Sequence, residues 1–240
     1  IGRCFRNEDI DTTHNPEFTI LELYQEYADY EDMMDLVETL FQTIAQELTG
    51  TTTVEYDGVD INLANWNRIT FEEAIEQELD IQSVAELERV DIQNYLLDYT
   101  EENLEEMSRD ELLFELFEER VEDELEGPVF VTEYPTVSTP LCQTVEGDES
   151  RLQRFEAFIC GMEVGNAYTE LTDPIEQRDR LLDQANRDEE SVNMEFIEAI
   201  SYGMPPTAGL GLGIDRLAML VTDSQTIKAV LPFPMSAERI

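Results

Sequence analysis

The sequence predicts an α+β fold in which helices flank an antiparallel β-sheet. Strand-like segments joined by tight turns are typical of antiparallel neighbours. Between them, hydrophobic residues recur at helical spacing, in an order too irregular for repeated strand–helix units. Hydrophobic residues make up 42% of the 240 residues, which is enough for a core although the formal net charge is −42. We therefore expect a folded α+β protein and not a disordered acidic chain.

Residues 1–63 predict two strands, a helix and a hairpin. The segments "RCFRNE" and "EFTILELYQEY" alternate as strands do, and "DIDTTHNP" between them supplies turn and cap residues. Residues 30–48 carry hydrophobic side chains at helical spacing, and Gly50 is suited to end that helix. The next segment, "TTTVEYDGVDINL", is typical of a hairpin that turns at Asp57 and Gly58.

Residues 70–125 differ in character from the rest. The stretches "TFEEAIEQELDIQSVAELERV" and "DYTEENLEEMSRDELLFELFEERVEDEL" are typical of acidic amphipathic helices. Ser108 and Glu111 have the spacing of a capping box. No polar residue recurs there in a pattern that suggests chemistry, so we interpret this region as a helical insertion with a solvated outer face.

The remaining chain predicts a buried strand at 127–135 and a hairpin at 155–171 that turns near Cys160 and Gly161. Helices are expected in "DPIEQRDRLLDQANRDEE" and "NMEFIEAISYG". The segment "TAGLGLGI" predicts a strand, and "DRLAMLVT" predicts the start of the final helix. Strands that return as hairpins between these helices favour the antiparallel sheet.

The charge composition indicates the setting in which the protein works. Only Lys228 is a lysine, whereas Asp and Glu total 56. At molar salt the Debye length falls to about 3 Å, so repulsion between surface carboxylates is screened. We therefore interpret the acidity as the adaptation of a halophile and not as a sign of a basic partner. No basic stripe marks a nucleic-acid-binding face, but salt weakens phosphate contacts in any protein, so this excludes little.

Several classes of protein are disfavoured. The sequence has no apolar run of transmembrane length and no signal peptide, so we expect a cytoplasmic protein without a membrane partner. Cys4, Cys142 and Cys160 lack metal-like spacing and His14 is the single histidine, so a zinc site is not expected. Because the chain opens on Ile1 within a predicted strand, we expect it to be a fragment of a longer protein.

Three alternating glycines mark the predicted C-terminal strand. Alternate residues of a strand share one face, so Gly209, Gly211 and Gly213 leave that face bare. Glycine weakens a strand, and a bare face indicates that a ligand or another backbone lies against it. Tight packing against a helix explains the spacing equally well. Arg216 follows at the predicted start of a helix, within reach of the glycine face.

A polar face is also predicted on the strand near residue 20. Phe18, Ile20, Glu22 and Tyr24 share this face, and the residues between them include leucines suited to the core. The pattern is typical of a sheet that lines a cleft, although a half-exposed strand gives it as well.

The hairpin at 155–171 carries two groups of polar residues. They are Asn166, Tyr168 and Glu170 on one face of the second strand, and Glu156 and Glu163 on either side of the turn. Paired carboxylates beside a phosphate are suited to Mg²⁺. Glu163 is out of phase with Asn166, so a shared pocket requires a β-bulge, for which Gly165 is the natural position. On so acidic a protein, two glutamates are also expected as ordinary surface charge.

Three long segments resemble one family. "FRNEDIDTTHNPEFTILELYQEYADY" resembles the second signature of class II aminoacyl-tRNA synthetases, in the form found in lysyl-tRNA synthetases. "GMEVGNAYTELTDPIEQR" is similar to the lysine pocket of that family, and "GMPPTAGLGLGIDRLAMLVTDSQTIKAVLPFP" is similar to its third signature. The resemblance runs from residue 1 to about residue 235 and is weakest across the helical insertion.

The resemblance implies a role for each matching residue. Residues implied to bind ATP are Arg6 at the α-phosphate and the substrate carboxylate, Glu8 near the adenine amino group, His14 at the outer phosphates, Phe18 stacked on adenine, and Arg216 on the other side of adenine and near the γ-phosphate. Residues implied to bind lysine are Glu22 at the α-ammonium, Tyr24 and Glu170 at the ε-ammonium, Asn166 and Tyr168 beside them, and Gly211 as the floor. Glu156 and Glu163 are implied to bind Mg²⁺. Arg6 and Arg216 would also be the catalytic groups.

The implied reaction is ATP-dependent activation of lysine to lysyl-adenylate, followed by transfer to tRNA(Lys). The carboxylate nucleophile carries no proton to remove, so catalysis is expected from in-line positioning and neutralisation of phosphate charge. A guanidinium can hold a phosphate and a carboxylate together, which explains why a chain so poor in cations keeps Arg6. Neutral amino acids would leave Glu170 as an unpaired charge.

Parts of the family pattern lie outside residues 1–240. They are the first signature, which forms the dimer interface, and the N-terminal β-barrel that reads the anticodon. We therefore expect these residues to be part of a catalytic domain, with 70–125 as an insertion, from a full-length homodimer. We expect the residues alone to have little or no aminoacylation activity.

Two other functions stay open from the sequence. A relative without the anticodon-reading barrel could attach a lysyl group to a protein lysine on an elongation factor, although "TAGLGLGIDR" favours the tRNA enzymes. A non-catalytic binding module could keep the fold, but it would be expected to lose Arg6, Arg216 or the glutamate pair.

Overall fold

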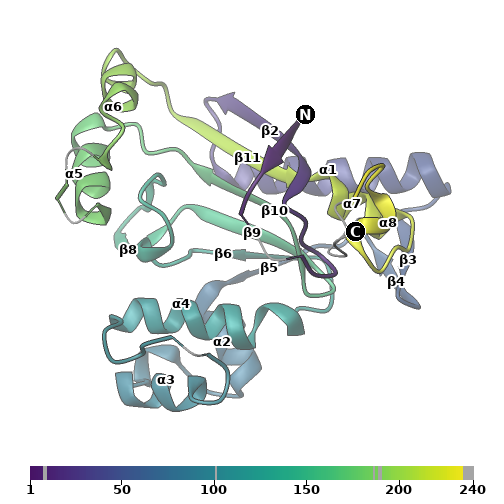
Figure 1. The fold of residues 1–240 in the computed structure, drawn as a ribbon, viewed down its shortest axis with the longest axis horizontal. Helices are drawn as coiled ribbons and strands as arrows, with labels where there is room; N and C mark the ends of the chain where they lie inside the picture. Colours follow the sequence, from purple (N-terminus) through teal and green to yellow (C-terminus); the bar gives the residue numbers. More distant parts are fainter. Residues whose placement is uncertain (8–9, 101, 186, 189–190, 235–240) are drawn as a thin grey trace, which may run out of the picture.

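A seven-stranded sheet forms the centre of the molecule, with strands in the order β1-β2-β11-β10-β9-β6-β5 (Figure 1). The structure is a computed structural model and describes residues 1–7, 10–100, 102–185, 187–188 and 191–234. All neighbouring strands of this sheet run antiparallel except β5 and β6, which run parallel. The mainly antiparallel α+β fold predicted from the sequence is therefore confirmed.

The strands are β1 (Gly2–Phe5), β2 (Glu17–Glu26), β3 (Thr53–Tyr56), β4 (Val59–Asn62), β5 (Asn67–Thr70), β6 (Val129–Thr132), β7 (Thr144–Val145), β8 (Asp148–Leu152), β9 (Arg154–Ile159), β10 (Met162–Thr169) and β11 (Thr207–Gly213). The α-helices are α1 (Tyr30–Thr49), α2 (Phe71–Leu79), α3 (Arg89–Leu96), α4 (Arg109–Arg120), α5 (Pro174–Gln184), α6 (Met194–Ser201), α7 (Ile214–Val221) and α8 (Ile227–Val230). Short 3₁₀ helices are η1 (Val84–Glu86), η2 (Glu122–Glu124) and η3 (Thr136–Ser138).

Helix α1 covers one face of the sheet. Asp29 caps its N-terminus by accepting hydrogen bonds from two backbone amides, and Gly50 ends it in the left-handed conformation with φ 78°. Val37 and Phe41 on the buried side of α1 pack in the same core cluster as Leu210 of β11. Burial of this apolar surface is the main stabilising contribution on this side of the sheet. The glycines that alternate with the core residues along β11 are thereby placed on the opposite face.

The helical segment 71–124 covers part of that opposite face. It connects the parallel strands β5 and β6, and parallel neighbours need a long crossover of this kind. We refer to α2, α3 and α4 as the crossover helices. They build a second core cluster that includes Phe71 and Phe117 and packs on Val131 and Phe158 from the sheet. The crossover helices lie at the bottom of Figure 1, below β5 and β6.

The structure corrects several expected boundaries. The long acidic stretches are shorter helices, because Asp80 ends α2 in the left-handed conformation and α4 begins only after its cap, Ser108. The expected capping box of Ser108 and Glu111 is present. Strand β5 and the β7–β8 hairpin were not predicted from the sequence. Helix α7 was expected to be the last, but α8 follows it.

Within the described residues, the helices are too short or too polar to cross a membrane.

Candidate active site

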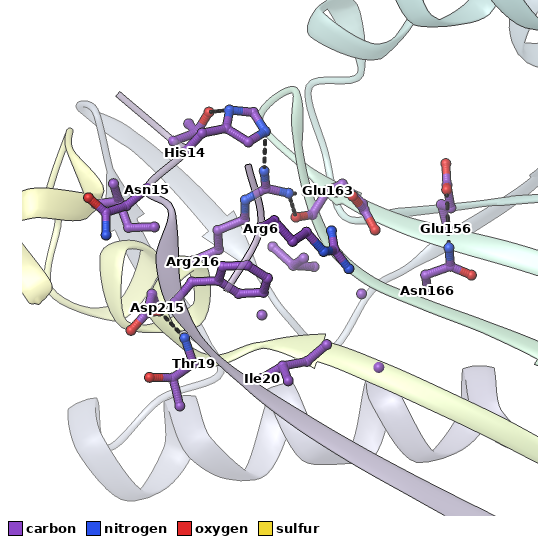
Figure 2. A pocket seen from close by; sticks show the side chains of 17 residues that line it. Arg6, His14, Asn15, Thr19, Ile20, Glu156, Glu163, Asn166, Asp215 and Arg216 are labelled. Carbon is purple, nitrogen blue, oxygen red and sulfur yellow. Dashed lines mark hydrogen bonds and ion pairs between the residues drawn. The ribbon is translucent and has the colours of Figure 1, made fainter. Parts of the chain in front are cut away.

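A cavity of about 300 Å³ opens on the sheet face opposite α1, beside the part that the crossover helices cover. Side chains from the loop before β2, from β2, from the β9–β10 hairpin and from the β11–α7 junction meet there (Figure 2). The predicted site residues that line it are Arg6, His14, Phe18, Glu156, Glu163, Asn166, Gly211 and Arg216. The structure therefore brings most of the predicted ATP and metal residues together around one cavity. Glu8 lies outside the described residues.

The strand register explains why residues far apart in sequence share this face. Gly211 pairs with Glu22 on one side and with Asn166 on the other, and Asn166 pairs with Glu156. Directly opposed residues of neighbouring strands point to the same face. The register of β9 and β10 shifts between Glu163 and Gly165, which confirms the predicted β-bulge. This bulge turns Glu163 into the cavity lined by Asn166.

The face of β11 that carries the alternating glycines lies against the cavity and against polar side chains. A Cβ atom at position 211 would lie 3.4 Å from Cδ1 of Ile20, and Gly211 faces the cavity. At position 209, a Cβ would lie 2.3 Å from Oε1 of Glu170 and 2.8 Å from Cε1 of Tyr24. Gly211 therefore faces a cavity and not a helix, whereas at Gly209 the bare face makes room for two predicted lysine-binding side chains.

Arg216 lies between His14 and Glu163 (Figure 2). Its Nη1 donates to the backbone oxygen of Glu163 over 2.7 Å and to Oε2 of the same residue over 3.4 Å. Its Nη2 lies 3.0 Å from Nε2 of His14. Arg6 reaches the same cavity, and its Cζ lies 5.1 Å from the centroid of the Phe18 ring. Two guanidiniums and an aromatic ring on one cavity suit a stacked base with phosphates.

The loop before β2 is ordered by Asp11. Oδ1 of Asp11 accepts hydrogen bonds from the backbone amides of Thr13 and His14, and Oδ2 lies 2.8 Å from Nδ1 of His14. Burial raises the pKa of Asp11, but these hydrogen bonds outweigh burial and lower it overall. The carboxylate therefore stays ionised and fixes the orientation of the His14 ring.

Asp215, in the first turn of α7, holds β2 against this helix. Asp215 is 8% exposed, and its Oδ2 accepts a hydrogen bond from the backbone amide of Thr19 over 2.6 Å. Phe18 precedes Thr19 and Arg216 follows Asp215, so this bond ties together the two segments that carry the ring and the guanidinium. The sequence does not reveal this role of Asp215, because the bond spans 196 positions.

The other predicted lysine residues form a neighbouring group and are not among the residues that line the cavity. They are Glu22, Tyr24, Tyr168 and Glu170. Gly209 pairs with both Tyr24 and Tyr168, one row along the sheet from Gly211. Burial raises the pKa of Glu170 to about 7, and Oε1 of Glu170 is buried without a hydrogen-bond partner in the described part of the chain. Burial and the charge of Glu170 raise the pKa of Tyr24, although Tyr24 is 69% exposed.

Glu156 is not surface charge, in contrast to the alternative left open by the sequence. It is 8% exposed, and burial raises its pKa against the opposing effect of Arg154. Nη2 of Arg154 and Nδ2 of Asn166 both donate to Oε1 of Glu156. Burial and the charges of Glu156 and neighbouring carboxylates raise the pKa of Glu122 in η2 to about 8. Arg154 and Glu122 are neighbours of Glu156 that the sequence pattern does not reveal.

The carboxylates fit a magnesium ion that is shared with phosphates. Glu156 and Glu163 line the same cavity, and the charge of Glu163 adds to burial in raising the pKa of Glu156. No group of three or more potential metal ligands is present within the described ranges. Mg²⁺ commonly takes one or two carboxylates and completes its shell with water and substrate phosphates. The residues present are therefore suitable ligands for an ion that binds together with a nucleotide.

The chain belongs to the family of class II tRNA synthetases (D, K and N), whose model matches residues 1–237. The matched residues include the antiparallel sheet and the cavity beside β2, β10 and β11.

Several similar proteins carry the name lysine–tRNA ligase. The chain is 42% identical over 241 residues to a lysine–tRNA ligase of Enterococcus faecalis, covering 98% of the chain and 48% of the relative. It is 45% identical over 244 residues to that of Nostoc punctiforme, covering 98% and 43%. It is 42% identical over 246 residues to that of Bacillus subtilis, covering 100% and 49%. The chain thus spans about half the length of these curated relatives.

Proposed function

We propose that the protein to which this chain belongs is a lysine–tRNA ligase, which activates lysine with ATP and transfers it to tRNA(Lys). The observation that supports this most is the meeting of Arg6, Arg216, Glu156 and Glu163 around one cavity, with Glu170 in the adjoining group of side chains. The similarity to lysine–tRNA ligases over nearly the whole chain supports the same assignment.

The cavity supplies the charges that the first step needs. Arg6 would hold the α-phosphate and the substrate carboxylate, and Arg216 with His14 would hold the outer phosphates. Phe18 would stack on adenine. These groups place the carboxylate in line with the α-phosphorus, so that the P–O bond to pyrophosphate breaks as the new P–O bond forms. No proton is removed from the nucleophile, and no general base is required.

Glu156 and Glu163 would hold Mg²⁺ together with the phosphates of ATP. When bound, the ion would neutralise charge that develops on the leaving pyrophosphate. The hydrogen bonds that Glu156 accepts from Arg154 and Asn166 fix its carboxylate beforehand.

Glu170 would select a cationic side chain. Its Oε1 is buried without a hydrogen-bond partner within the described residues, and burial raises its pKa. An ε-ammonium would supply both the missing hydrogen bond and the opposite charge, whereas a neutral side chain would leave the carboxylate unpaired. Tyr24 and Tyr168 flank Gly209 and would close this subsite, and Glu22 would take the α-ammonium.

The assignment is tested by ATP–pyrophosphate exchange with the full-length protein across the amino acids, in molar KCl. Exchange that depends on lysine is expected. Exchange driven by another amino acid would refute the substrate assignment. Transfer of lysine to an elongation factor, with none to tRNA(Lys), would favour the protein-modifying alternative.

We further propose that residues 70–125 are an insertion within a partial catalytic domain, and that the full-length protein is a cytoplasmic homodimer. The crossover helices with their own core cluster support the first part.

The excess of Asp and Glu over Lys and Arg supports function at high salt, as in a halophile. Thermal unfolding should then shift to higher temperature between 0.1 and about 2 M KCl. An unchanged or lower transition temperature at high KCl would contradict this.

A further inference from the structure

Arg154 is a buried cation that does not itself line the proposed ATP cavity. It lies on β9, whose residues are all buried, and is 7% exposed. Burying a guanidinium is costly unless it is paired and hydrogen-bonded. The pairing partner, Glu156, raises the pKa of Arg154 although burial lowers it, so the group stays charged.

The guanidinium of Arg154 reaches two residues that line the cavity. Nη2 donates to Oε1 of Glu156, and Nε donates to Oδ1 of Asn166 over 3.4 Å. Nδ2 of Asn166 in turn donates to Oε1 of Glu156 over 3.3 Å. The three side chains thus form a closed ring of hydrogen bonds. Arg154 itself is not among the residues that line the cavity.

The opposite side of Arg154 contacts the core of the crossover helices. Its Cζ lies 4.6 Å from the centroid of the Tyr134 ring. Tyr134 is fully buried, and its ring centroid lies 5.3 Å from that of Phe71 in α2 and 5.6 Å from that of Phe117 in α4. A guanidinium over an aromatic face is stabilised by the ring quadrupole. Arg154 therefore joins this aromatic core to the wall of the cavity.

We propose that Arg154 is a positioning residue, held by Tyr134, that orients the carboxylate of Glu156 and the amide of Asn166 for their ligands. Two donors converge on Oε1 of Glu156 and so fix the plane of its carboxylate. Because Nε can only donate, Asn166 must turn its oxygen to Arg154 and its amide nitrogen to Glu156. Arg154 thereby orients both Glu156, a proposed metal ligand, and Asn166, a residue of the proposed lysine pocket. This inference rests on the proposed function of the cavity.

The test compares Arg154→Gln with the wild type in the full-length protein. Two readouts apply: binding of Mn²⁺ together with a non-hydrolysable ATP analogue, followed by electron paramagnetic resonance, and the KM for lysine in ATP–pyrophosphate exchange. Changes in residues that orient metal ligands typically weaken metal binding or activity 10- to 100-fold. We expect at least about tenfold weaker Mn²⁺ binding together with a raised KM for lysine. Tyr134→Leu should act in the same direction, whereas Tyr134→Phe, which keeps the ring, should not.

Arg151→Gln is the matched control. Arg151 also pairs with a glutamate, Glu72 of α2, and its side chain is 12% exposed. Neither Arg151 nor Glu72 lines the cavity. We expect Arg151→Gln to lower thermal stability without changing Mn²⁺ binding or the KM for lysine. If Arg154→Gln behaves in the same way, Arg154 is a structural residue and the proposal is wrong.

Arg154→Lys keeps the test valid if Arg154→Gln does not fold. An ammonium retains the charge next to Glu156 but lacks the fork that reaches two acceptors at once. Weaker Mn²⁺ binding by a folded Arg154→Lys variant supports the proposal, and wild-type binding overturns it. The Mn²⁺ readout does not depend on which amino acid is activated. Normal Mn²⁺ binding without lysine-dependent exchange in the wild type would refute the proposed function instead.

Discussion

Nη2 of Arg216 lies 3.0 Å from Nε2 of His14, although the two residues are 202 positions apart. A guanidinium can only donate, so Nε2 of His14 accepts in this pair. Nδ1 of His14 then carries the proton and donates to Oδ2 of Asp11. The chain Asp11–His14–Arg216 thus holds one tautomer of the ring and one direction of the guanidinium before any substrate binds.

Replacing His14 should weaken ATP binding more than lysine binding. His14→Ala removes the acceptor that orients Arg216, and hydrogen bonds to charged groups contribute about 1.5–3 kcal/mol. We expect the KM for ATP in pyrophosphate exchange to rise roughly tenfold or more, with a smaller change for lysine. An equal rise in both KM values would contradict a role confined to the phosphates.

Replacing Glu170 should stabilise the fold at alkaline pH. The folded pKa of Glu170 is raised from 4.5 to about 7 by burial, so the stabilising contribution is complete below pH 4.5 and is lost as pH rises through about 7. At pH 8 the free energy of unfolding of Glu170→Gln should therefore exceed that of the wild type by about 1–2 kcal/mol, after allowance for solvent screening. The difference should vanish near pH 4.5 in denaturant titrations. A difference that does not change with pH would contradict this.

The same carboxyl should couple lysine binding to proton release. A cationic ligand favours the ionised form of Glu170, so below pH 7 binding must first remove a proton. Calorimetry at pH 6 in buffers of different ionisation enthalpy should show release of a fraction of a proton on lysine binding. The released fraction should fall toward zero at pH 8.5 and should be absent in Glu170→Gln.

A methyl group at position 209 should block the lysine subsite. A Cβ there would lie 2.3 Å from Oε1 of Glu170, closer than real Cβ contacts. We expect Gly209→Ala to raise the KM for lysine at least tenfold, with a smaller effect on ATP binding. Gly2→Ala is the control, because Gly2 also lies in a strand and a Cβ there meets no atom within 4 Å. A normal KM for lysine in Gly209→Ala would show that Glu170 moves freely.

Removing the carboxylate of Asp215 should damage both stability and the ATP site. Asp215→Ala leaves the amide of Thr19 without its acceptor, at a cost of about 1–3 kcal/mol. The unfolding free energy should fall by this amount, and the KM for ATP should rise because Phe18 and Arg216 lose their common anchor. Asp148→Ala is the control, since Asp148 is an exposed acceptor for the nearby amide of Ser150. Loss of stability with an unchanged KM would refute the anchoring role.

The sequence predicted those elements whose signals are local. Alternation marked β2 and β11, and hydrophobic spacing with Gly50 marked α1. Strand β5 escaped prediction because its four residues are exposed or partly exposed and pair in parallel only through a distant crossover. Strand β8 escaped because Asp148–Leu152 begins with charged and polar residues that are exposed.

The candidate site was predicted residue by residue from resemblance, but its supports were not. Arg154 and Asp215 act through contacts that depend on the assembled sheet, and neither stands out in a strongly charged sequence. The few arginines in the sequence also serve more than one purpose. Arg89 and Arg109 do not line the cavity and donate to backbone oxygens of the crossover segment, including those of Leu104 and Val84. Arginine is therefore kept for structure as well as for chemistry.

The one-residue bulge before Gly165 makes the length of the β9–β10 hairpin as critical as its composition. Strand side chains alternate between the two faces with a period of two. Deleting a single residue there would therefore move Asn166, Tyr168 and Glu170 to the opposite face of the sheet, which packs against the hydrophobic core. Substitutions can adjust this pocket by degrees, whereas a change of length would abolish it in one event. We expect homologous proteins to keep the number of residues in this hairpin even where the residues themselves differ.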